Sequence, residues 1–253
     1  MPAVILADSY YFNCSYDENN NRIKVEHSDG LEQFYEYDNI NRLIHYISMR
    51  KHDKIVDVNY VYNDNEKSKT IYSEGIFKEK IWFLDKDFEK VLKKETEDHK
   101  FIYYTYDEED RLVEMKDEND IIERITYLEN NTVEISSSLG ISETKQFSNT
   151  GKILKYIDNK GIETIYEYDS DDRLYHEYSS NHRIDNVYFY NDKDRITIIT
   201  DKIHNRVKRQ EFNDKGLIIR EEDYMYIKKY NYDSNGNLIS YLRIYNEDSL
   251  EEN

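Results

Sequence analysis

The chain repeats a tyrosine followed by Asp or Asn at intervals of roughly 22 residues. The clear copies are Tyr37-Asp38, Tyr62-Asn63, Tyr106-Asp107, Tyr168-Asp169, Tyr190-Asn191 and Tyr232-Asp233. Weaker copies, such as Tyr16-Asp17 and Leu84-Asp85, fill the gaps between them. A short fixed period indicates a repeat architecture, in which each copy is one small unit that stacks on the next. This period constrains the fold more strongly than any other feature of the sequence.

One copy of the repeat is predicted to be a β-hairpin. Residues 35–43, YEYDNINRL, show the pattern Y-x-Y-[DN]-x-x-x-R-[LI] that the strong copies share. Two tyrosines at positions i and i+2 lie on one face of a strand. The Asp and the three residues after it favour a tight turn, because Asp, Asn and Gly accept left-handed backbone angles or fold a side chain back onto the main chain. A second turn, as at Asp29-Gly30, closes the unit.

The whole chain is therefore predicted to be all-β. About eleven tandem hairpins of about 22 residues should form one continuous antiparallel sheet. Sheets of that size rarely stay open and flat, so this one should curl into a barrel, spiral or shell-like structure. We expect a single YD-repeat domain over residues 1–245 and a frayed acidic tail over 246–253. The best helical candidate, 86–96, lies in phase with the repeat, which favours a strand there.

The repeated motif resembles that of the RHS/YD-repeat family, and the resemblance extends from about Tyr16 to Tyr245. It implies consecutive hairpins that form one sheet coiled into a shell or barrel, which in large members encloses a toxin domain. This chain is far shorter, has no evident toxin domain, and lacks the apolar processing segment of the large toxins at its C-terminus. We therefore expect the fold of a short stand-alone member, without the role of encapsulation.

The charge of the chain limits its partners. It carries 53 Asp and Glu against 35 Lys and Arg, a net charge of −18. Such a balance disfavours nucleic-acid backbones and anionic membranes. It favours a basic protein, which long-range attraction would steer toward the chain. An acidic surface also keeps a β-rich repeat protein soluble and prevents edge-to-edge pairing.

Cysteine usage and the first residues predict a soluble, cytoplasmic protein. Cys14 is the only cysteine, so an intrachain disulfide cannot form and an oxidising compartment offers no benefit. Residues 1–8 have no basic region and only four consecutive apolar residues, which does not match a signal peptide. No apolar stretch is long enough to cross a bilayer.

The sequence shows no catalytic or metal-binding constellation, so we expect no enzyme activity, no cofactor and no metal. The seven histidines form no H-x-x-x-H or H-x-H pair. Acidic turns such as 107–110 loosely resemble calcium loops but lack the bidentate glutamate, and capping of the turn by Asp accounts for them. Cys14 occupies a position where other repeats have tyrosine, which predicts a small inward-facing residue without a base beside it.

Two sets of side chains are candidates for binding. One set is the arginines at 42, 111, 173 and 195, which follow the turn in equivalent positions. They predict a ladder of surface ion pairs or, alternatively, a row of positive charge that binds an anionic ligand. Aromatic rings are the second set, since they form either the core of a curled sheet or an exposed binding face. These rings are Tyr35, Tyr37, Tyr60, Tyr62, Tyr104, Tyr106, Tyr166, Tyr168, Tyr188, Tyr190, Tyr230, Tyr232 and the single tryptophan, Trp82.

Three functions fit these features. The first is a non-enzymatic protein that binds a macromolecule, such as an inhibitor or immunity-like protein that sequesters a basic partner. The alternative is a carbohydrate-binding module that uses the tyrosine face. The third is a structural or self-associating fragment of a larger RHS-type shell.

Overall fold

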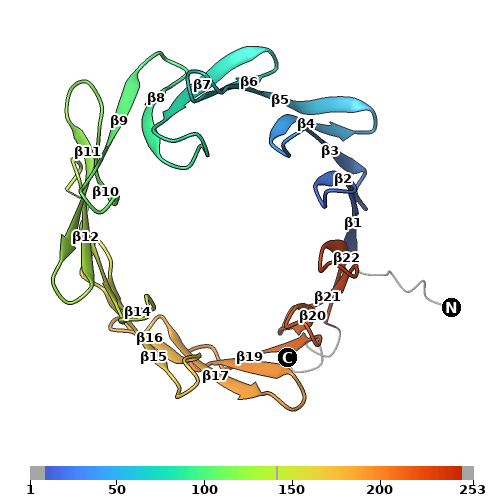
Figure 1. The fold of residues 1–253 in the computed structure, drawn as a ribbon. Coiled ribbons are helices and arrows are strands. Elements are labelled where there is room, and N and C mark those ends of the chain that lie inside the picture. The colour runs from blue at the N-terminus through green and yellow to red at the C-terminus, as the bar shows by residue number, and fades with distance from the viewer. Residues whose placement is uncertain (1–8, 141, 247–253) are drawn as a thin grey trace. The chain divides into compact units, whose positions relative to one another are not determined.

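The protein is all-β, as predicted. The computed structural model describes residues 9–140 and 142–246. These residues form 22 strands and no helix, and every strand pairing within the two units described below is antiparallel. Figure 1 shows the succession of hairpins from the blue N-terminal strands to the red C-terminal ones. The prediction of about eleven tandem hairpin repeats is therefore confirmed. Within the described part of the chain there is no helix with the length and apolarity that crossing a bilayer requires.

Contacts divide the chain into two units. Unit 1 comprises Met1–Val56, Tyr168–Glu177 and Ile184–Asn253, and unit 2 comprises Asp57–Glu167 and Tyr178–Arg183. The strands wholly in unit 1 are β1 (Tyr10–Tyr16), β2 (Arg22–His27), β3 (Leu31–Tyr37), β4 (Leu43–Arg50), β17 (Asp185–Asn191), β18 (Ile196–Asp201), β19 (Arg206–Phe212), β20 (Ile218–Glu222), β21 (Tyr226–Tyr232) and β22 (Leu238–Tyr245).

Unit 2 contains the middle of the repeat array. Its strands are β6 (Ser68–Ser73), β7 (Ile76–Phe83), β8 (Val91–Glu95), β9 (Phe101–Tyr106), β10 (Leu112–Lys116), β11 (Ile121–Leu128), β12 (Thr132–Ser137), β13 (Ser142–Phe147) and β14 (Ile153–Ile157). Three strands have residues in both units: β5 (Asp53–Asn63), β15 (Glu163–Tyr168) and β16 (Leu174–Ser179). From β5 to β15 each strand pairs with the next one in the sequence.

Unit 1 brings the first and last strands of the chain together. From β17 to β22 each strand pairs with the next, and the same holds from β1 to β4. In addition β1 pairs with β22, with Tyr10 opposite Arg243 and Phe12 opposite Tyr241. This pairing is expected of a sheet that curls, and it leaves neither β1 nor β22 as a free edge.

A bulge recurs at the tyrosine that precedes several of the turns. The register shifts between Glu36 and Tyr37, between Ser15 and Tyr16, and between Asn231 and Tyr232. Bulges bend a strand and increase its twist. The repeat therefore places a bend in several hairpins, at the residue that also marks the motif.

The sheet has little dry core. Among the described residues the only buried hydrophobic side chains are Cys14, Val25 and Phe83. Most strand side chains are half-buried, and every second position is often exposed. Tyrosine suits such a sheet, because its ring covers apolar area while its hydroxyl reaches a polar partner.

The repeat is interrupted at residues 84–90, where a longer loop replaces the tight turn. Val91–Glu95 is a strand, as the repeat phase predicted. Phe88 has a positive φ of 61° and packs back on Tyr62 and Phe83, with ring centroids 5.7 and 4.9 Å apart. Of the predicted tail, 246–253, only Asn246 lies within the described residues, where it is buried and its backbone N–H donates to Met225 O. Residues 1–8 also lie outside the described residues.

Candidate functional site

Many turns of the motif are capped by their own Asp or Asn side chain. At the turn after β3, Asp38 Oδ1 accepts hydrogen bonds from the backbone N–H groups of Ile40 and Arg42, at 3.0 and 2.9 Å. Asn41, between them, has a φ of 65°. This is a three-residue hairpin loop, a turn followed by one left-handed residue. The predicted Asp capping is confirmed here and recurs at Asp17, Asp107, Asp169, Asn213 and Asp233.

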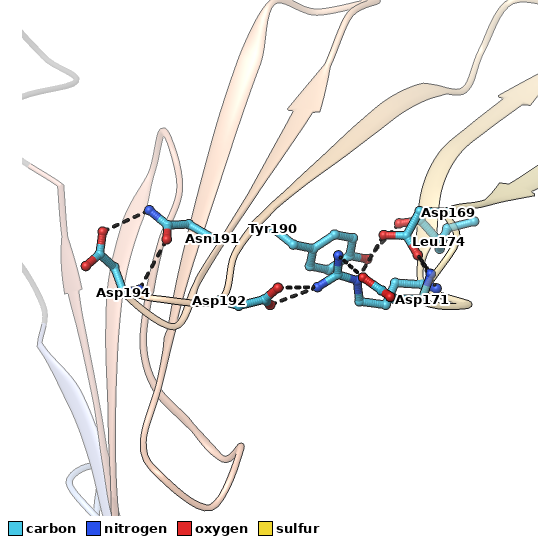
Figure 2. A network of polar contacts seen from close by, with 8 residues as sticks. Asp169, Asp171, Leu174, Tyr190, Asn191, Asp192 and Asp194 are labelled. Atoms are coloured by element: carbon cyan, nitrogen blue, oxygen red, sulfur yellow. Dashed lines mark hydrogen bonds and ion pairs between the residues drawn. The ribbon is translucent and has the colours of Figure 1, made fainter.

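The arginine after the turn joins one hairpin to the next. Arg173 Nε donates to Asp169 Oδ2 at 2.9 Å, and its Nη1 donates to both oxygens of Asp192 in the following repeat, at 2.8 and 3.0 Å. Figure 2 shows this network of polar contacts. The hydrogen bonds that Arg173 donates to Asp192 and Asp169 raise its pKa. The backbone and side chain of Arg173 in turn hold the pKa of Asp169 below its usual value. The predicted ladder of ion pairs is confirmed at this step and at Arg195, which pairs with Asp214.

The tyrosine before the turn also joins neighbouring hairpins. Tyr190 Oη donates to the backbone carbonyl of Leu174 at 2.6 Å, and the guanidinium carbon of Arg173 lies 4.4 Å from the centre of its ring. The equivalent hydroxyls of Tyr16, Tyr37, Tyr106, Tyr127 and Tyr232 donate to carbonyls of Leu238, Arg22, Val91, Leu112 and Ile218. The Tyr-Asp pair thus connects repeats through the Tyr and shapes the turn through the Asp.

The predicted aromatic set is half-buried throughout, neither core nor free surface. Tyr35, Tyr37, Tyr168, Tyr188, Tyr190, Tyr230 and Tyr232 lie in unit 1, whereas Tyr60, Tyr62, Tyr104, Tyr106, Tyr166 and Trp82 lie in unit 2. The rings of Tyr35 and Tyr230 contact tyrosines outside this set, Tyr46 and Tyr241. The ammonium groups of Lys80 and Lys93 lie 4.7 and 4.4 Å from the centre of the Trp82 indole.

Five rings form a strip where the first and last strands pair, which we call the terminal strip. Its members are Tyr10 and Phe12 of β1, His27 of β2, Tyr230 of β21 and Tyr241 of β22. Phe12 stacks on Tyr241 with centroids 5.0 Å apart, and Tyr241 contacts Tyr230 at 5.2 Å. Tyr10 lies 5.9 Å from His27, and its hydroxyl is 2.5 Å from His27 Nδ1.

Sequence reasoning selected only Tyr230 from the terminal strip. The other members lie outside the Tyr-Asp motif, from which the candidate tyrosines were chosen. A signal was nevertheless present, because alternate positions 10, 12, 14 and 16 are Tyr, Phe, Cys and Tyr. That alternation places one apolar face on β1. Cys14 is on this face and is buried, which raises the pKa of its thiol.

A buried carboxylate lies close to the terminal strip. Glu221 is 6% exposed, and its oxygens accept hydrogen bonds from Lys228, Lys208 and Gln210 at 2.6, 2.7 and 2.9 Å. Burial raises the pKa of Glu221, but the hydrogen bonds from these donors outweigh burial and bring the pKa to about 2. Burial, followed by the charge of Glu221, raises the pKa of Tyr230 to about 12. We call Glu221, Lys208, Lys228 and Gln210 the Glu221 cluster.

Arg243 adds a positive charge to the same face. Its guanidinium carbon lies 4.9 Å from the ring centre of Tyr226 and 5.4 Å from that of Tyr10. Its Nε is buried and has no hydrogen-bond partner among the described residues. Among those residues there is also no group of three or more His, Cys, Asp or Glu side chains that could hold a metal ion.

Comparison with known proteins gives no family. No family model matches the chain, and no curated protein matches it. The resemblance to the RHS/YD-repeat family therefore rests on the repeated Tyr-Asp motif and on the hairpins that it forms.

Several solved structures are similar at low identity. A crystal structure of TcdB2-TccC3 without its hypervariable C-terminal region is 13% identical, with a TM-score of 0.42, and the match covers 93% of this chain and 15% of that one. The Photorhabdus luminescens Tc holotoxin pore is 13% identical over 90% of this chain and 19% of that one, with a TM-score of 0.22. A porin-like protein from Bacteroides uniformis is 9% identical over 95% and 97% of the two chains, with a TM-score of 0.35. This chain thus spans less than a fifth of the TcdB2-TccC3 chain it matches.

Proposed function

We propose that the chain is a non-enzymatic protein that binds a basic protein partner through its Tyr-Asp turns. The observation that carries this proposal is the excess of carboxylates at the turn 107–111. Arg111 is the only cation of that turn, and it pairs with Asp107 and Glu109, each at 2.7 Å. The carboxylate of Asp110 pairs with Lys90 of the preceding loop. Glu108 is exposed and has no cationic partner among the residues that the structure describes.

The acids of these turns remain accessible even where they are paired. The side chains of Glu109 and Asp110 are 70% and 75% exposed, and those of Asp192 and Asp214 are 78% and 89% exposed. Exposed ion pairs contribute little energy, so an incoming lysine or arginine competes with the internal partner at little cost. Such charges mainly raise the rate of association and select the sign of the partner. A basic protein held in this way would be sequestered, as by an inhibitor.

Affinity purification tests the proposal, with the tagged protein captured from its native host together with bound proteins. We expect a basic protein in stoichiometric amount, which 0.5 M salt releases, since screening shortens the range of exposed charges to roughly 4 Å at that ionic strength. The double variant Glu108→Gln, Glu109→Gln should capture less of it. The control variant Glu97→Gln, Glu118→Gln removes the same charge from turns at the opposite ends of the strands. Equal loss with both variants, or no captured protein, would contradict the proposal.

A second candidate function is carbohydrate binding, and the terminal strip favours it. Half-buried rings lie side by side on β21, β22, β1 and β2, next to polar groups such as Gln33, which lies 3.2 Å from His27. Aromatic rings with adjacent hydrogen-bonding groups are typical of sites that bind sugars. A glycan array, together with tyrosine fluorescence during titration, tests this function. No response with either method would remove it.

A further inference from the structure

We propose that Arg243 binds the carboxylate of a small ligand on the face of the sheet that carries the terminal strip. The site consists of the Arg243 guanidinium with Tyr10 of β1 and Tyr226 of β21, which lie on the two strands that flank β22. This site is independent of the proposed binding of a basic partner, because it uses a cation and not the acidic turns, and it shares Tyr10 with the terminal strip.

Arg243 lacks the carboxylate partner that most of the described arginines have. The chain has an excess of 18 acidic residues, and the described arginines 50, 111, 173, 195 and 220 each pair with a carboxylate. Arg243 forms no ion pair and no hydrogen bond among the described residues, although its side chain is half-buried. Its Nε–H is withdrawn from water without an acceptor, which is an unfavourable arrangement that an oxyanion would relieve.

The guanidinium lies beside two rings that cannot satisfy its donors. The rings of Tyr226 and Tyr10 lie 4.9 and 5.4 Å from Cζ and contribute cation–π attraction, but a ring supplies no acceptor in the plane of the N–H groups. The buried Nε–H therefore stays without an acceptor. A carboxylate matches the planar fork of a guanidinium with two parallel hydrogen bonds.

The charges around Arg243 favour a ligand with a single negative charge. Lys228 lies opposite Arg243 in the sheet, but Glu221 at 2.6 Å and Asp223 at 3.8 Å neutralise it. Beside the neutralised Lys228, the charge of Arg243 thus remains uncompensated on this face of the sheet. A group with a single negative charge suits this environment, whereas a phosphate dianion is repelled more strongly. The adjacent rings of Tyr10 and Tyr241, 6.3 Å apart, favour a carboxylate that is attached to a ring.

The experiment is an NMR titration that follows the Nε–H signal of Arg243 in the full chain. The probes are glucuronate, benzoate, acetate, glucose and inorganic phosphate. We expect glucuronate or benzoate to shift the Nε–H signal in a saturable manner, acetate to bind more weakly, and glucose to leave the signal unchanged. A stronger response to glucuronate identifies an acidic sugar as the ligand, and a stronger response to benzoate identifies an aromatic acid.

Variants separate a binding role from a structural one. Arg243→Gln should weaken binding of the best carboxylate by about tenfold or more, as loss of a charged hydrogen bond does. Arg243→Lys keeps the charge but not the fork and should restore part of the affinity. Lys229→Gln removes a cation from the opposite face of the neighbouring strand and should leave affinity unchanged. Phosphate binding as tight as that of the carboxylates, or equal losses in the Arg243→Gln and Lys229→Gln variants, would overturn the proposal.

Discussion

Glu221 is the residue whose surroundings depart most from those of an ordinary surface acid. It is almost fully withdrawn from water, yet three donors from β19 and β21 reach its two oxygens. A buried carboxylate is tolerated only when such partners replace its hydration. The low pKa of about 2 follows from them, because they favour the charged form more than burial disfavours it.

We predict that Glu221 stabilises the fold above pH 4.5 and ceases to do so under acid conditions. Its pKa in the folded chain, about 2, lies below the ordinary value of 4.5. The contribution is therefore complete above pH 4.5 and disappears as the pH falls toward 2. Full loss corresponds to an energy on the order of 3 kcal/mol.

Urea unfolding followed by circular dichroism checks this prediction. At pH 7, Glu221→Gln should lower the free energy of unfolding by about 2 kcal/mol, because two lysines lose their acceptor. At pH 2 the variant and the wild type should be equally stable. Glu222→Gln is the control, since that carboxylate pairs with Arg220 and its side chain is 31% exposed. A constant difference between Glu221→Gln and the wild type from pH 7 to pH 2 would refute this account.

At the scale of the element, one hairpin depends on two local devices, the capped turn and the tyrosine that precedes it. The turn requires one residue with a positive φ, supplied by Asn20, Asn41, Asp110, Asp172, Gly216 and Gly236 in different repeats. Asn, Asp and Gly are the residues that adopt this conformation at the lowest cost. This requirement explains why the motif tolerates any of the three at that position.

Gly216 supplies the residue with positive φ in one of these turns. Its φ is +76°, and a Cβ built there would meet no atom within 4 Å, so any cost of substitution comes from the backbone alone. Gly216→Ala should destabilise the protein by about 1 kcal/mol. Gly216→Asn should cost clearly less, since Asn41 has a φ of 65° at the equivalent position. Thermal unfolding measures both variants, and a larger loss with Asn than with Ala would contradict the explanation.

The hydrogen bond between Tyr190 and the Leu174 carbonyl connects two neighbouring repeats. Tyr190→Phe removes the donor to the Leu174 carbonyl but keeps the ring beside Arg173. We expect the free energy of unfolding to fall by about 1 kcal/mol, the usual net contribution of such a bond. Tyr11→Phe, at a residue that is 47% exposed, should change it by less than about 0.5 kcal/mol. Chemical denaturation compares the two, and equal effects would argue against a connecting role for Tyr190.

At the scale of the whole molecule, the pairing of β1 with β22 is the decisive contact. It removes two free strand edges, which otherwise present unpaired N–H and C=O groups to other molecules. It also creates the terminal strip and the Arg243 site, because their residues come from both ends of the sequence. Tyr16 strengthens the same junction by donating to the Leu238 carbonyl at 2.8 Å.

Deleting β22 should therefore cause self-association. A variant that ends at residue 237 exposes the edges of β1 and β21, and we expect concentration-dependent oligomers in light scattering after size-exclusion chromatography. A variant that ends at residue 246 retains β22 and serves as the control, which should elute like the wild type. If the variant that ends at residue 237 stays monomeric, the paired edge does not protect the chain.

Sequence and structure agree wherever the determining interactions are local. Asp38 and its turn lie within five residues of each other, so residue types alone predicted the hairpin and its cap. The strand Val91–Glu95 followed from the phase of the repeat, although its composition permits a helix. The loop at 84–90 was not foreseen, because the packing of Phe88 on Tyr62 and Phe83 depends on contacts between strands.

The sequence by itself determined the repeating unit of this protein: the strands, the turns and the face that carries the tyrosines. These features arise from steric and hydrogen-bonding preferences within a few residues, which are the same in every copy. Only the tertiary structure decided that Arg243 lies beside Tyr10 and that Lys208 and Lys228 meet at Glu221. Those contacts depend on strand register and on the pairing of the chain's first and last strands, which no local preference encodes.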